Sequence, residues 1–393
     1  MQIVFFDLSA ERQKMLPLSY TRVLSDIRIG ILKISEKWIN RLGIDQVSYL
    51  TEDYLQEKYP CFQSEENIFI QSNICPNDKL LGEIMRLEDK DVLMKDETIL
   101  AFRGTIEQFM QQDWNYVDYD GEYLQISHPW QIFKHNGEEL EYDFAWLTAG
   151  KESQPISGTN RVLNPSQVFI EEGASVECAI LNAKNGPIYI GKDAEVMEGS
   201  VVRGPFALCE HGVLKLASKI YGPTTIGPHS KVGGEVNNSV ILGYSNKGHD
   251  GFLGNSVLGE WCNIGADSNN SNLKNNYAEV RLWSYETGRY APTGLQFCGL
   301  IMGDHSKCGI NTMFNTGTVV GVSANIFGGG FPRNFIPSFS WGGSAGFSEY
   351  KLNKVFEVAD KVMSRRSIEF DEVEQNILKA VFERSQEFRK SYK

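Results

Sequence analysis

Residues 190–232 read IGKDAEVMEGSVVRGPFALCEHGVLKLASKIYGPTTIGPHSKV, and this stretch decides the fold of the larger part of the chain. An aliphatic residue stands at every sixth position without exception: Ile190, Val196, Val202, Leu208, Leu214, Ile220, Ile226 and Val232. A six-residue period is typical of a β-solenoid, in which short strands turn at corners and apolar side chains point inward. Because one turn cannot bury its own face, neighbouring turns must stack into a continuous core.

The six-residue register continues beyond this stretch, with two interruptions. It returns at seven later positions: Phe252, Leu258, Ile264, Cys308, Phe314, Val320 and Ile326. Residues 244–256 and 267–303 break the register and are rich in Asn, Gly and aromatic residues. Loops that leave a rigid scaffold often carry function, so we expect the site there. The alternative, an all-β sandwich, needs longer strands that alternate with a period of two.

The first 145 residues have the pattern of an α/β domain. We expect strands at 3–7, 46–50 and 67–70 and helices at 29–42 and 80–87, hence a parallel sheet with its functional edge at the strand C-termini. Residues 121–150 are aromatic and irregular and are expected to connect the domains while packing on the first. Helices are predicted at 352–365 and 370–389, either capping the solenoid or contacting a neighbouring subunit. The expected domains are thus 1–145, 146–345 and 346–393.

The composition limits the class of protein. The 393 residues contain 41% hydrophobic and 22% charged residues, which is ordinary for a soluble globular protein. A formal charge of −12 argues against broad nucleic-acid binding. We expect no signal peptide and no membrane span, because no window holds about 18 apolar residues. The 7 cysteines include no CxxC pair, which favours reduced thiols and a cytoplasmic location.

One stretch carries a family resemblance. Residues 246–255 read NKGHDGFLGN and residues 263–266 read NIGA. Residues 160–340 are similar to the acetyltransferase half of the bifunctional bacterial enzyme that makes UDP-N-acetylglucosamine, whose pattern is roughly N-H-x-x-Y-L-G-D followed by N-I-G-A-G. The whole chain resembles a GlmU-like subfamily of Bacteroidetes-type sequences described as sugar-1-phosphate nucleotidyltransferases. Phe252 stands where that family has a substrate-contacting Tyr.

The resemblance implies a left-handed β-helix, acetyl-CoA as acyl donor and a homotrimer with its sites between subunits. It assigns the catalytic base to His249 and a sugar contact to Asn263. It places the donor's pantetheine arm against residues 309–330. The residues implied to contact the donor are Ala266, Asn311 and Gly328.

The residues themselves allow this chemistry. The pKa of a free imidazole, about 6.5, suits His249 to take a proton from an attacking amine. Lys247 and Lys231 are cations near glycines and could hold a substrate phosphate. The plainer alternatives are a surface-loop histidine without a role and two solvated lysines. The family's own phosphate-binding Arg and Lys are not reproduced, since Tyr221 and Asn237 stand near those places.

The first domain matches a nucleotidyl-transfer site only in part. Such sites need a glycine-rich loop after the first strand, a basic residue for phosphate and an acidic residue for Mg²⁺. Residues 8–12 contain no glycine. Arg22 takes the place of the family's lysine in its P-K-V-L element, and Arg12 could join it at a phosphate-binding edge. Asn73 stands where the family has its metal-binding Asp, so Mg²⁺ binding is expected there only if nucleotidyl transfer is active.

Three hypotheses follow for function. The leading one is acetyl-CoA-dependent acyl transfer to a sugar phosphate or nucleotide sugar, with an attached nucleotidyltransferase-type domain. The second is uridylyl or thymidylyl transfer to a sugar-1-phosphate, with the solenoid as a trimerisation scaffold. The third is a catalytically inactive trimeric module that binds a nucleotide sugar.

Overall fold

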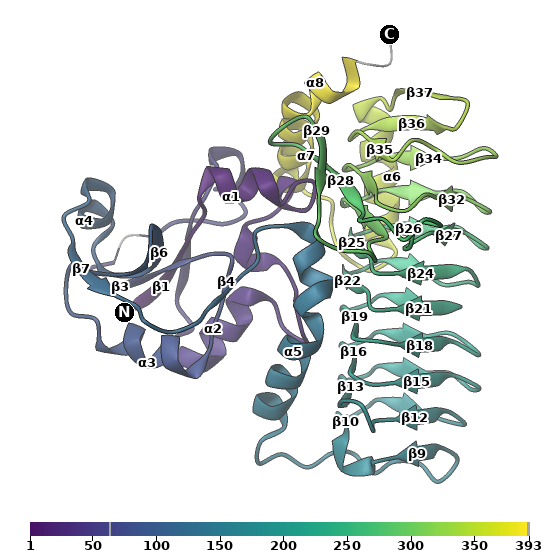
Figure 1. The fold of residues 1–393 in the computed structure, drawn as a ribbon, viewed down its shortest axis with the longest axis horizontal. Coiled ribbons are helices and arrows are strands. Elements are labelled where there is room, and N and C mark those ends of the chain that lie inside the picture. Colours follow the sequence, from purple (N-terminus) through teal and green to yellow (C-terminus); the bar gives the residue numbers. More distant parts are fainter. Residues whose placement is uncertain (63, 391–393) are drawn as a thin grey trace. The chain divides into compact units, whose positions relative to one another are not determined.

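The computed structural model describes residues 1–62 and 64–390, which divide into two compact units. The first unit contains Met1–Met15, Thr21–Ile27 and Leu32–Ser127. The second contains Leu16–Tyr20, Arg28–Ile31 and the chain from His128 onward. An α/β unit, a parallel β-helix and C-terminal helices are all present (Figure 1), so the predicted fold class is confirmed.

The first unit is built on a 6-stranded sheet in the order β2-β1-β3-β6-β5-β7. Strands β1, β2 and β3 are parallel, whereas β6 runs antiparallel to both β3 and β5. The expected parallel sheet is therefore mixed. Its strands, together with the two of the small β4–β8 sheet, are β1 (Gln2–Phe6), β2 (Val47–Leu50), β3 (Asn67–Gln71), β4 (Ile74–Cys75), β5 (Asp91–Lys95), β6 (Thr98–Gly104), β7 (Asn115–Asp118) and β8 (Leu124–Gln125).

Local signals set the ends of the helices in this unit. Helix α2 (Ile34–Leu42) starts later than the predicted residue 29, because Gly30 takes a left-handed φ of 73°, which is incompatible with an α-helix. Helix α3 (Asp78–Arg86) starts where the Asn77 side chain accepts a hydrogen bond from Leu80 N at 2.9 Å. The remaining helices are α1 (Ser9–Lys14) and α4 (Ile106–Gln111).

The solenoid consists of three sheets, whose strands come from successive turns and pair in parallel in all but one case. The 9-stranded sheet contains β10 (Val168–Ile170), β13 (Ile188–Ile190), β16 (Phe206–Leu208), β19 (Thr224–Ile226), β22 (Val240–Gly243), β25 (Val257–Glu260), β30 (Leu300–Met302), β33 (Thr318–Val320) and β35 (Phe335–Ile336). The 6-stranded sheet contains β9 (Arg161–Leu163), β12 (Ile180–Asn182), β15 (Val201–Arg203), β18 (Lys219–Tyr221), β21 (Glu235–Asn237) and β24 (Phe252–Gly254).

The third sheet of the solenoid is 10-stranded and carries the residues discussed below. Its strands are β11 (Ser175–Val176), β14 (Glu195–Val196), β17 (Val213–Leu214), β20 (Lys231–Val232), β23 (Asn246–Lys247), β26 (Asn263–Ile264), β31 (Lys307–Cys308), β34 (Asn325–Ile326), β36 (Ser340–Gly343) and β37 (Gly346–Glu349). All of its pairings are parallel except that of β37 with β36, which is antiparallel. A short β27 (Asn269–Asn270) pairs with β32 (Met313–Phe314).

The eight corner residues between 190 and 232 confirm the predicted register. Each is at most 1% exposed, and all belong to one hydrophobic core. Ile190, Leu208 and Ile226 are paired through successive turns, which places equivalent residues one above another. Fully burying such a side chain contributes about 1.5–3 kcal/mol, so the stacked column is a main source of stability.

The first interruption does not leave the solenoid, contrary to the prediction. Residues 244–256 include β23 and β24, which pair with the turn before. The inward residue is Leu253, paired with Val236, rather than the predicted Phe252. The predicted position is wrong by one residue because the next inward residue, Leu258, follows Leu253 after five residues rather than six.

The second interruption, residues 267–303, does contain a true insertion. Its strands β28 (Arg281–Ser284) and β29 (Arg289–Pro292) form an antiparallel hairpin. Trp283 of this hairpin stacks on Phe335 with ring centroids 4.2 Å apart. The hairpin is therefore anchored to the solenoid by aromatic packing.

Residues 121–150 contain a long helix where an irregular connection was expected. Helix α5 (Pro129–Thr148) begins with proline in its first turn, and His128 N donates to the Gln131 side chain at 2.9 Å. It contacts β19, β22 and β25 and belongs to the second unit, whereas residues 121–127 belong to the first. The frequent aromatic residues concealed the helical period.

The C-terminal helices were predicted with small differences in their ends. They are α6 (Leu352–Ser364), α7 (Glu372–Arg384) and α8 (Gln386–Arg389), and the last two are separated at Ser385. Val355, Ala359 and Met363 form the buried face of α6. No helix in the described parts of the chain has the length and apolar character needed to cross a bilayer.

Candidate functional site

A row of polar side chains follows the outer face of the 10-stranded sheet. Lys231 pairs with Asn246, Asn246 with Asn263, and Asn263 with Lys307, each in the next turn of the solenoid. Successive residues of a strand point to opposite faces, so these four lie outside while their neighbours, beginning with Val232, point inward. Adjacent strands lie about 4.8 Å apart, so the row presents closely spaced polar groups.

His249 follows this row at the corner after β23. It is exposed, in the turn Gly248–Gly251. Gly234 lies under this turn with a φ of 74°, and a Cβ there would come within 2.9 Å of the His249 carbonyl oxygen. The turn can therefore lie against the previous one only because residue 234 is a glycine. Ala266 occupies the corresponding corner one turn later, after β26.

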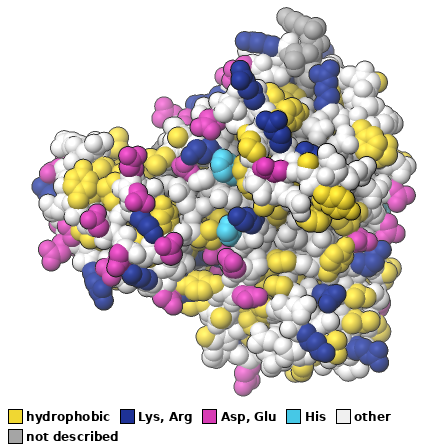
Figure 2. All heavy atoms as spheres, in the orientation of Figure 1, with side chains coloured by type: hydrophobic (Ala, Val, Ile, Leu, Met, Phe, Trp, Pro, Cys, Tyr) yellow, Lys and Arg dark blue, Asp and Glu magenta, His cyan; other side chains and the backbone are white. Residues whose placement is uncertain are grey.

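These residues meet at a cavity of about 760 Å³. His249, Asn263, Lys231 and Ala266, which the sequence analysis had singled out, all line it. The cations among its lining residues are Lys215, Lys231, Lys307, Arg365 and Arg366. The described lining residues include no Asp or Glu, although the whole chain carries a formal charge of −12. Figure 2 shows acidic and basic side chains interspersed on the visible face, so a lining with only one sign of charge is a local feature.

The crowding of these cations changes their ionisation. Burial lowers the pKa of Lys231, and the nearby positive charges, Arg366 first among them, lower it further. Burial and then Arg365 lower the pKa of Arg366. Arg366 also donates to the Asn246 side chain at 3.4 Å. An anionic ligand in this cavity would relieve the repulsion between like charges, so the site is suited to a phosphate-bearing molecule.

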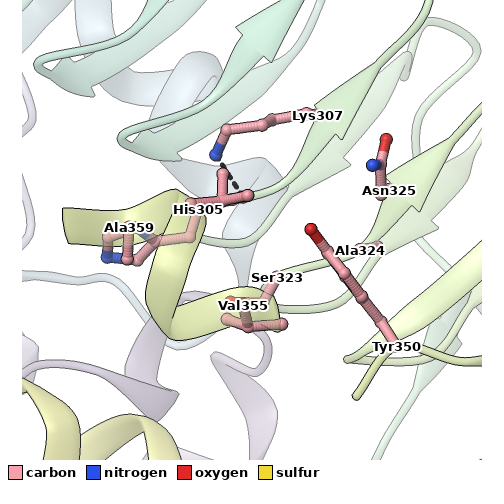
Figure 3. A pocket seen from close by; sticks show the side chains of 9 residues that line it. His305, Lys307, Ser323, Ala324, Asn325, Tyr350, Val355 and Ala359 are labelled. Carbon is pink, nitrogen blue, oxygen red and sulfur yellow. Dashed lines mark hydrogen bonds between the residues drawn. The ribbon is translucent and has the colours of Figure 1, made fainter. Parts of the chain in front are cut away.

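Lys307 is held between the cavity and helix α6. Its Nζ donates to the His305 carbonyl oxygen at 2.9 Å (Figure 3), and burial lowers its pKa to about 8. In the same view Val355 and Ala359 of α6 lie below it, with Tyr350 at the side. Cys262 also lines the cavity, but burial raises the pKa of its thiol to about 12. At neutral pH that thiol is not a nucleophile.

An aromatic ladder runs along a neighbouring corner of the solenoid. Its rings stack from turn to turn, and every member has a positive φ: His211, His229, Tyr244, Trp261 and His305. Tyr244 and Trp261 also line the cavity. The faces of these rings are covered by each other, so they stiffen the cavity wall and leave ring edges for a ligand.

Three predicted residues of the solenoid do not line this cavity. Lys247 is 2% exposed and occupies an inward position, paired with Val232. Asn311 donates its backbone N–H to the Ala266 carbonyl at 2.8 Å and lies one turn beyond Ala266. Gly328 is exposed in a turn after β34, with a φ of 95°. The roles given to these three remain predictions.

The candidate residues of the first unit are occupied by internal partners. Arg12 is 6% exposed and forms an ion pair with Asp7 at 2.6 Å, and it also donates to the Arg22 carbonyl at 3.0 Å. Arg22 is 2% exposed and lies 3.9 Å from the Asp26 carboxylate. Both guanidinium groups therefore point into the unit and contribute to its packing.

Asn73, the proposed metal ligand, is also enclosed. Its side-chain nitrogen Nδ2 donates to the Glu11 carboxylate at 2.9 Å, and its side-chain oxygen Oδ1 accepts from the Gln71 side chain at 2.9 Å. Although burial alone would raise the pKa of Glu11, hydrogen bonds from Lys14 and Ser127 lower it. Among the described residues there is no group of three His, Cys, Asp or Glu side chains placed to hold a metal. Mg²⁺ would have to displace the present partners of Asn73 and Glu11, so the residues do not fit the ion as they stand.

The sequence reasoning missed the cations contributed by Lys215, Lys307, Arg365 and Arg366. The adjacent arginines at the end of a predicted helix were not a signal by themselves, because the helix dipole favours cations at any helix C-terminus. Nothing in the sequence indicated that this end of α6 lies beside turns that precede it by more than 100 residues. Only the packing of α6 on the solenoid brings them together.

Residues 3–152 match the family model described as sugar nucleotidyl transferase. A bifunctional sugar-1-phosphate nucleotidylyltransferase/acetyltransferase of Sulfurisphaera tokodaii is 28% identical over 198 residues, which are 50% of this chain. The chain spans about half the length of this curated relative, 48%.

Two solved structures share a weaker likeness. An Arabidopsis UDP-N-acetylglucosamine acyltransferase matches with a TM-score of 0.29 and 14% identity over 54% of this chain and 80% of the other. A UDP-N-acetylglucosamine acyltransferase from Campylobacter jejuni matches with a TM-score of 0.18 and 17% identity over 60% of this chain and 83% of the other.

Proposed function

We propose that this chain is a transferase that moves the acetyl group of acetyl-CoA onto an amine of a sugar phosphate or nucleotide sugar. The observation that carries the proposal is the cavity in which His249 and Asn263 meet five cations without a carboxylate. The relative from Sulfurisphaera tokodaii, named as both a nucleotidylyltransferase and an acetyltransferase, supports this class of reaction. The finer assignment to a GlmU-like enzyme rests on the motif of residues 246–255.

In the proposed reaction His249 acts as general base. Its imidazole takes the proton of the sugar amine while the nitrogen attacks the thioester carbonyl. The new C–N bond forms as the C–S bond breaks, and the proton passes to the departing thiolate, which leaves as the thiol. Asn263 would hold a hydroxyl of the sugar, and backbone N–H groups at the solenoid corner would stabilise the oxyanion.

The cations of the cavity bind the charged part of the substrates. Lys231, Arg365 and Arg366 would pair with phosphate oxygens, and a charge-assisted hydrogen bond to phosphate is roughly twice as strong as a neutral one. Lys215 and Lys307 add positive potential at the walls. A homotrimer is proposed on the resemblance alone.

A second activity, nucleotidyl transfer to a sugar-1-phosphate, is proposed for the first unit. The match of residues 3–152 to the sugar nucleotidyl transferase model favours it. Arg12 forms an ion pair with Asp7, and Asn73 donates a hydrogen bond to Glu11. A nucleoside triphosphate that used these two side chains would first have to break those interactions. The alternative for this unit is to bind the nucleotide sugar without turning it over.

One set of assays separates these functions. The full chain is incubated with acetyl-CoA and amino-sugar phosphates while thiol release is recorded, and with a nucleoside triphosphate, sugar-1-phosphate and Mg²⁺ while pyrophosphate is recorded. We expect thiol release in the first assay, lowered about 10²- to 10⁴-fold by His249→Ala, because a positioned general base contributes that factor. The matched control is His135→Ala, on α5 and outside the cavity.

Unchanged turnover in His249→Ala would remove the assigned base. Pyrophosphate release alone would leave the solenoid as a scaffold. Binding of a nucleotide sugar with neither product would favour an inactive binding module.

A further inference from the structure

Lys247 is the one lysine among the inward residues of its column in the 10-stranded sheet. The inward positions of the neighbouring turns belong to Leu214, Val232, Ile264 and Cys308, all buried. Lys247 pairs with Val232 and is only 2% exposed. A cation among aliphatic side chains costs stability unless it has a specific partner, so the partner indicates what the lysine does.

That partner is the backbone of the catalytic candidate. Lys247 Nζ donates to the His249 carbonyl oxygen at 2.5 Å. The neighbouring carbonyls of the turn have ordinary backbone partners: Lys247 O accepts from Gly233 N at 2.7 Å, Asp250 O from Asp267 N at 3.0 Å and Gly251 O from Glu235 N at 3.3 Å. Within residues 1–62 and 64–390, the His249 carbonyl has Lys247 Nζ as its donor instead.

We propose that Lys247 is a positioning residue, whose ammonium group fixes the turn that aims the His249 imidazole into the cavity. This inference rests on the proposed function, since it gives a role in the same reaction. The space under the turn, made by the missing side chain of Gly234, lets the His249 carbonyl point toward the lysine. Lys247 thereby acts through His249 and not, as predicted from the sequence, on substrate phosphate.

The ionisation of Lys247 provides a separate signature. Burial lowers its pKa to about 8, against the raising effects of Asp250, Cys308 and Asp267, while Lys219 lowers it slightly further. The ammonium form donates more strongly than the free amine. The wild-type kcat should therefore fall as pH rises through about 8, and this ionisation should be absent when residue 247 cannot ionise.

The test compares Lys247→Met with Leu214→Met in the full chain. Both put methionine into the same inward column, but only the first removes the donor to His249. We expect kcat for acetyl transfer to fall about 10- to 100-fold in Lys247→Met, because a displacement near 1 Å of a catalytic group has that effect. The KM for acetyl-CoA should stay within about two-fold. Amide exchange of residues 248–251 should become faster, and Leu214→Met should show none of these changes.

Each outcome decides a different point. A kcat for Lys247→Met equal to that of Leu214→Met, or a loss confined to KM, would overturn the positioning role. An unchanged pH limb near 8 in Lys247→Met would do the same. If the wild type transfers no acetyl group, or His249→Ala keeps full turnover, the proposed function fails. Unchanged amide exchange of residues 248–251 in Lys247→Met would independently show that the lysine does not hold the turn.

Discussion

The cavity of the solenoid contains cations, as does the first unit with Arg12 and Arg22, but the charges of the two regions have different partners. Arg12 faces Asp7 at 2.6 Å, and Glu11 faces Lys14 at 2.6 Å, so positive and negative groups neutralise one another inside the unit. The cavity in the second unit gathers Lys231, Arg365 and Arg366 with no carboxylate among its described lining residues.

The difference separates a structural cation from one available to a ligand. A guanidinium with a buried carboxylate and carbonyl partners already has its hydrogen bonds satisfied. Cations that repel each other across a cavity gain from an incoming anion, and the lowered pKa of Lys231 reports that repulsion along with burial. The solenoid is therefore the better place to expect phosphate binding.

The largest effect is expected from breaking the internal pair of the first unit. Arg12→Met would leave the Asp7 carboxylate, whose side chain is 1% exposed, without its buried partner. We expect a loss of about 3–5 kcal/mol in the free energy of unfolding of this unit, the usual cost of removing one partner of a buried pair. Hydrogen exchange of the β1 and β2 amides measures it.

Arg41→Met is the matched control for Arg12→Met. Its ion pair with Asp78 spans 2.8 Å, close to the 2.6 Å of the Arg12 pair, but the Asp78 side chain is 83% exposed. The expected loss there is below about 1 kcal/mol. Equal losses of stability for the two variants would remove the contrast between the units. Normal stability with lost nucleotide binding in Arg12→Met would show that Arg12 serves a ligand.

A smaller effect is expected from the cations of the cavity. The double variant Arg365→Gln/Arg366→Gln should weaken binding of acetyl-CoA or of an amino-sugar phosphate about 10- to 100-fold, since hydrogen bonds to charged groups contribute roughly 1.5–3 kcal/mol each. Calorimetric titration at two salt concentrations should show a weaker salt dependence in the variant. Lys361→Gln, an exposed position on α6 outside the cavity, is the control. Equal affinities in all three proteins would mean that the arginines do not bind the ligand.

The smallest effect concerns the dependence of stability on pH. The pKa of Lys247 is lowered from 10.5 to about 8 in the folded chain. Between these values the unfolded chain binds a proton that the folded chain has lost, so the contribution of Lys247 to stability rises with pH over this window. Urea unfolding should therefore show that, between pH 7 and 10, the free energy of unfolding of the wild type rises relative to that of Lys247→Met. A difference that stays constant would mean that the pKa is not lowered.

The first interruption, residues 244–256, shows how far the six-residue pattern can be extended along the chain. Six residues counted back from Leu258 predict Phe252 as an inward corner, but the step between the inward residues Leu253 and Leu258 is only five residues. A shift by one residue turns a strand's side chains to opposite faces. The direction of Lys247 follows from the same register, and it points inward.

The sequence by itself determined the repeating core and the motif around His249. Burial of one aliphatic residue per corner is a local, periodic requirement, and it can be read without knowing how the turns stack. Only the tertiary structure decided that Arg365 and Arg366 lie beside Lys231, and that the ammonium of Lys247 bonds to the His249 carbonyl. Both depend on packing between segments and on the exact register of the turns, which no repeat in the sequence encodes.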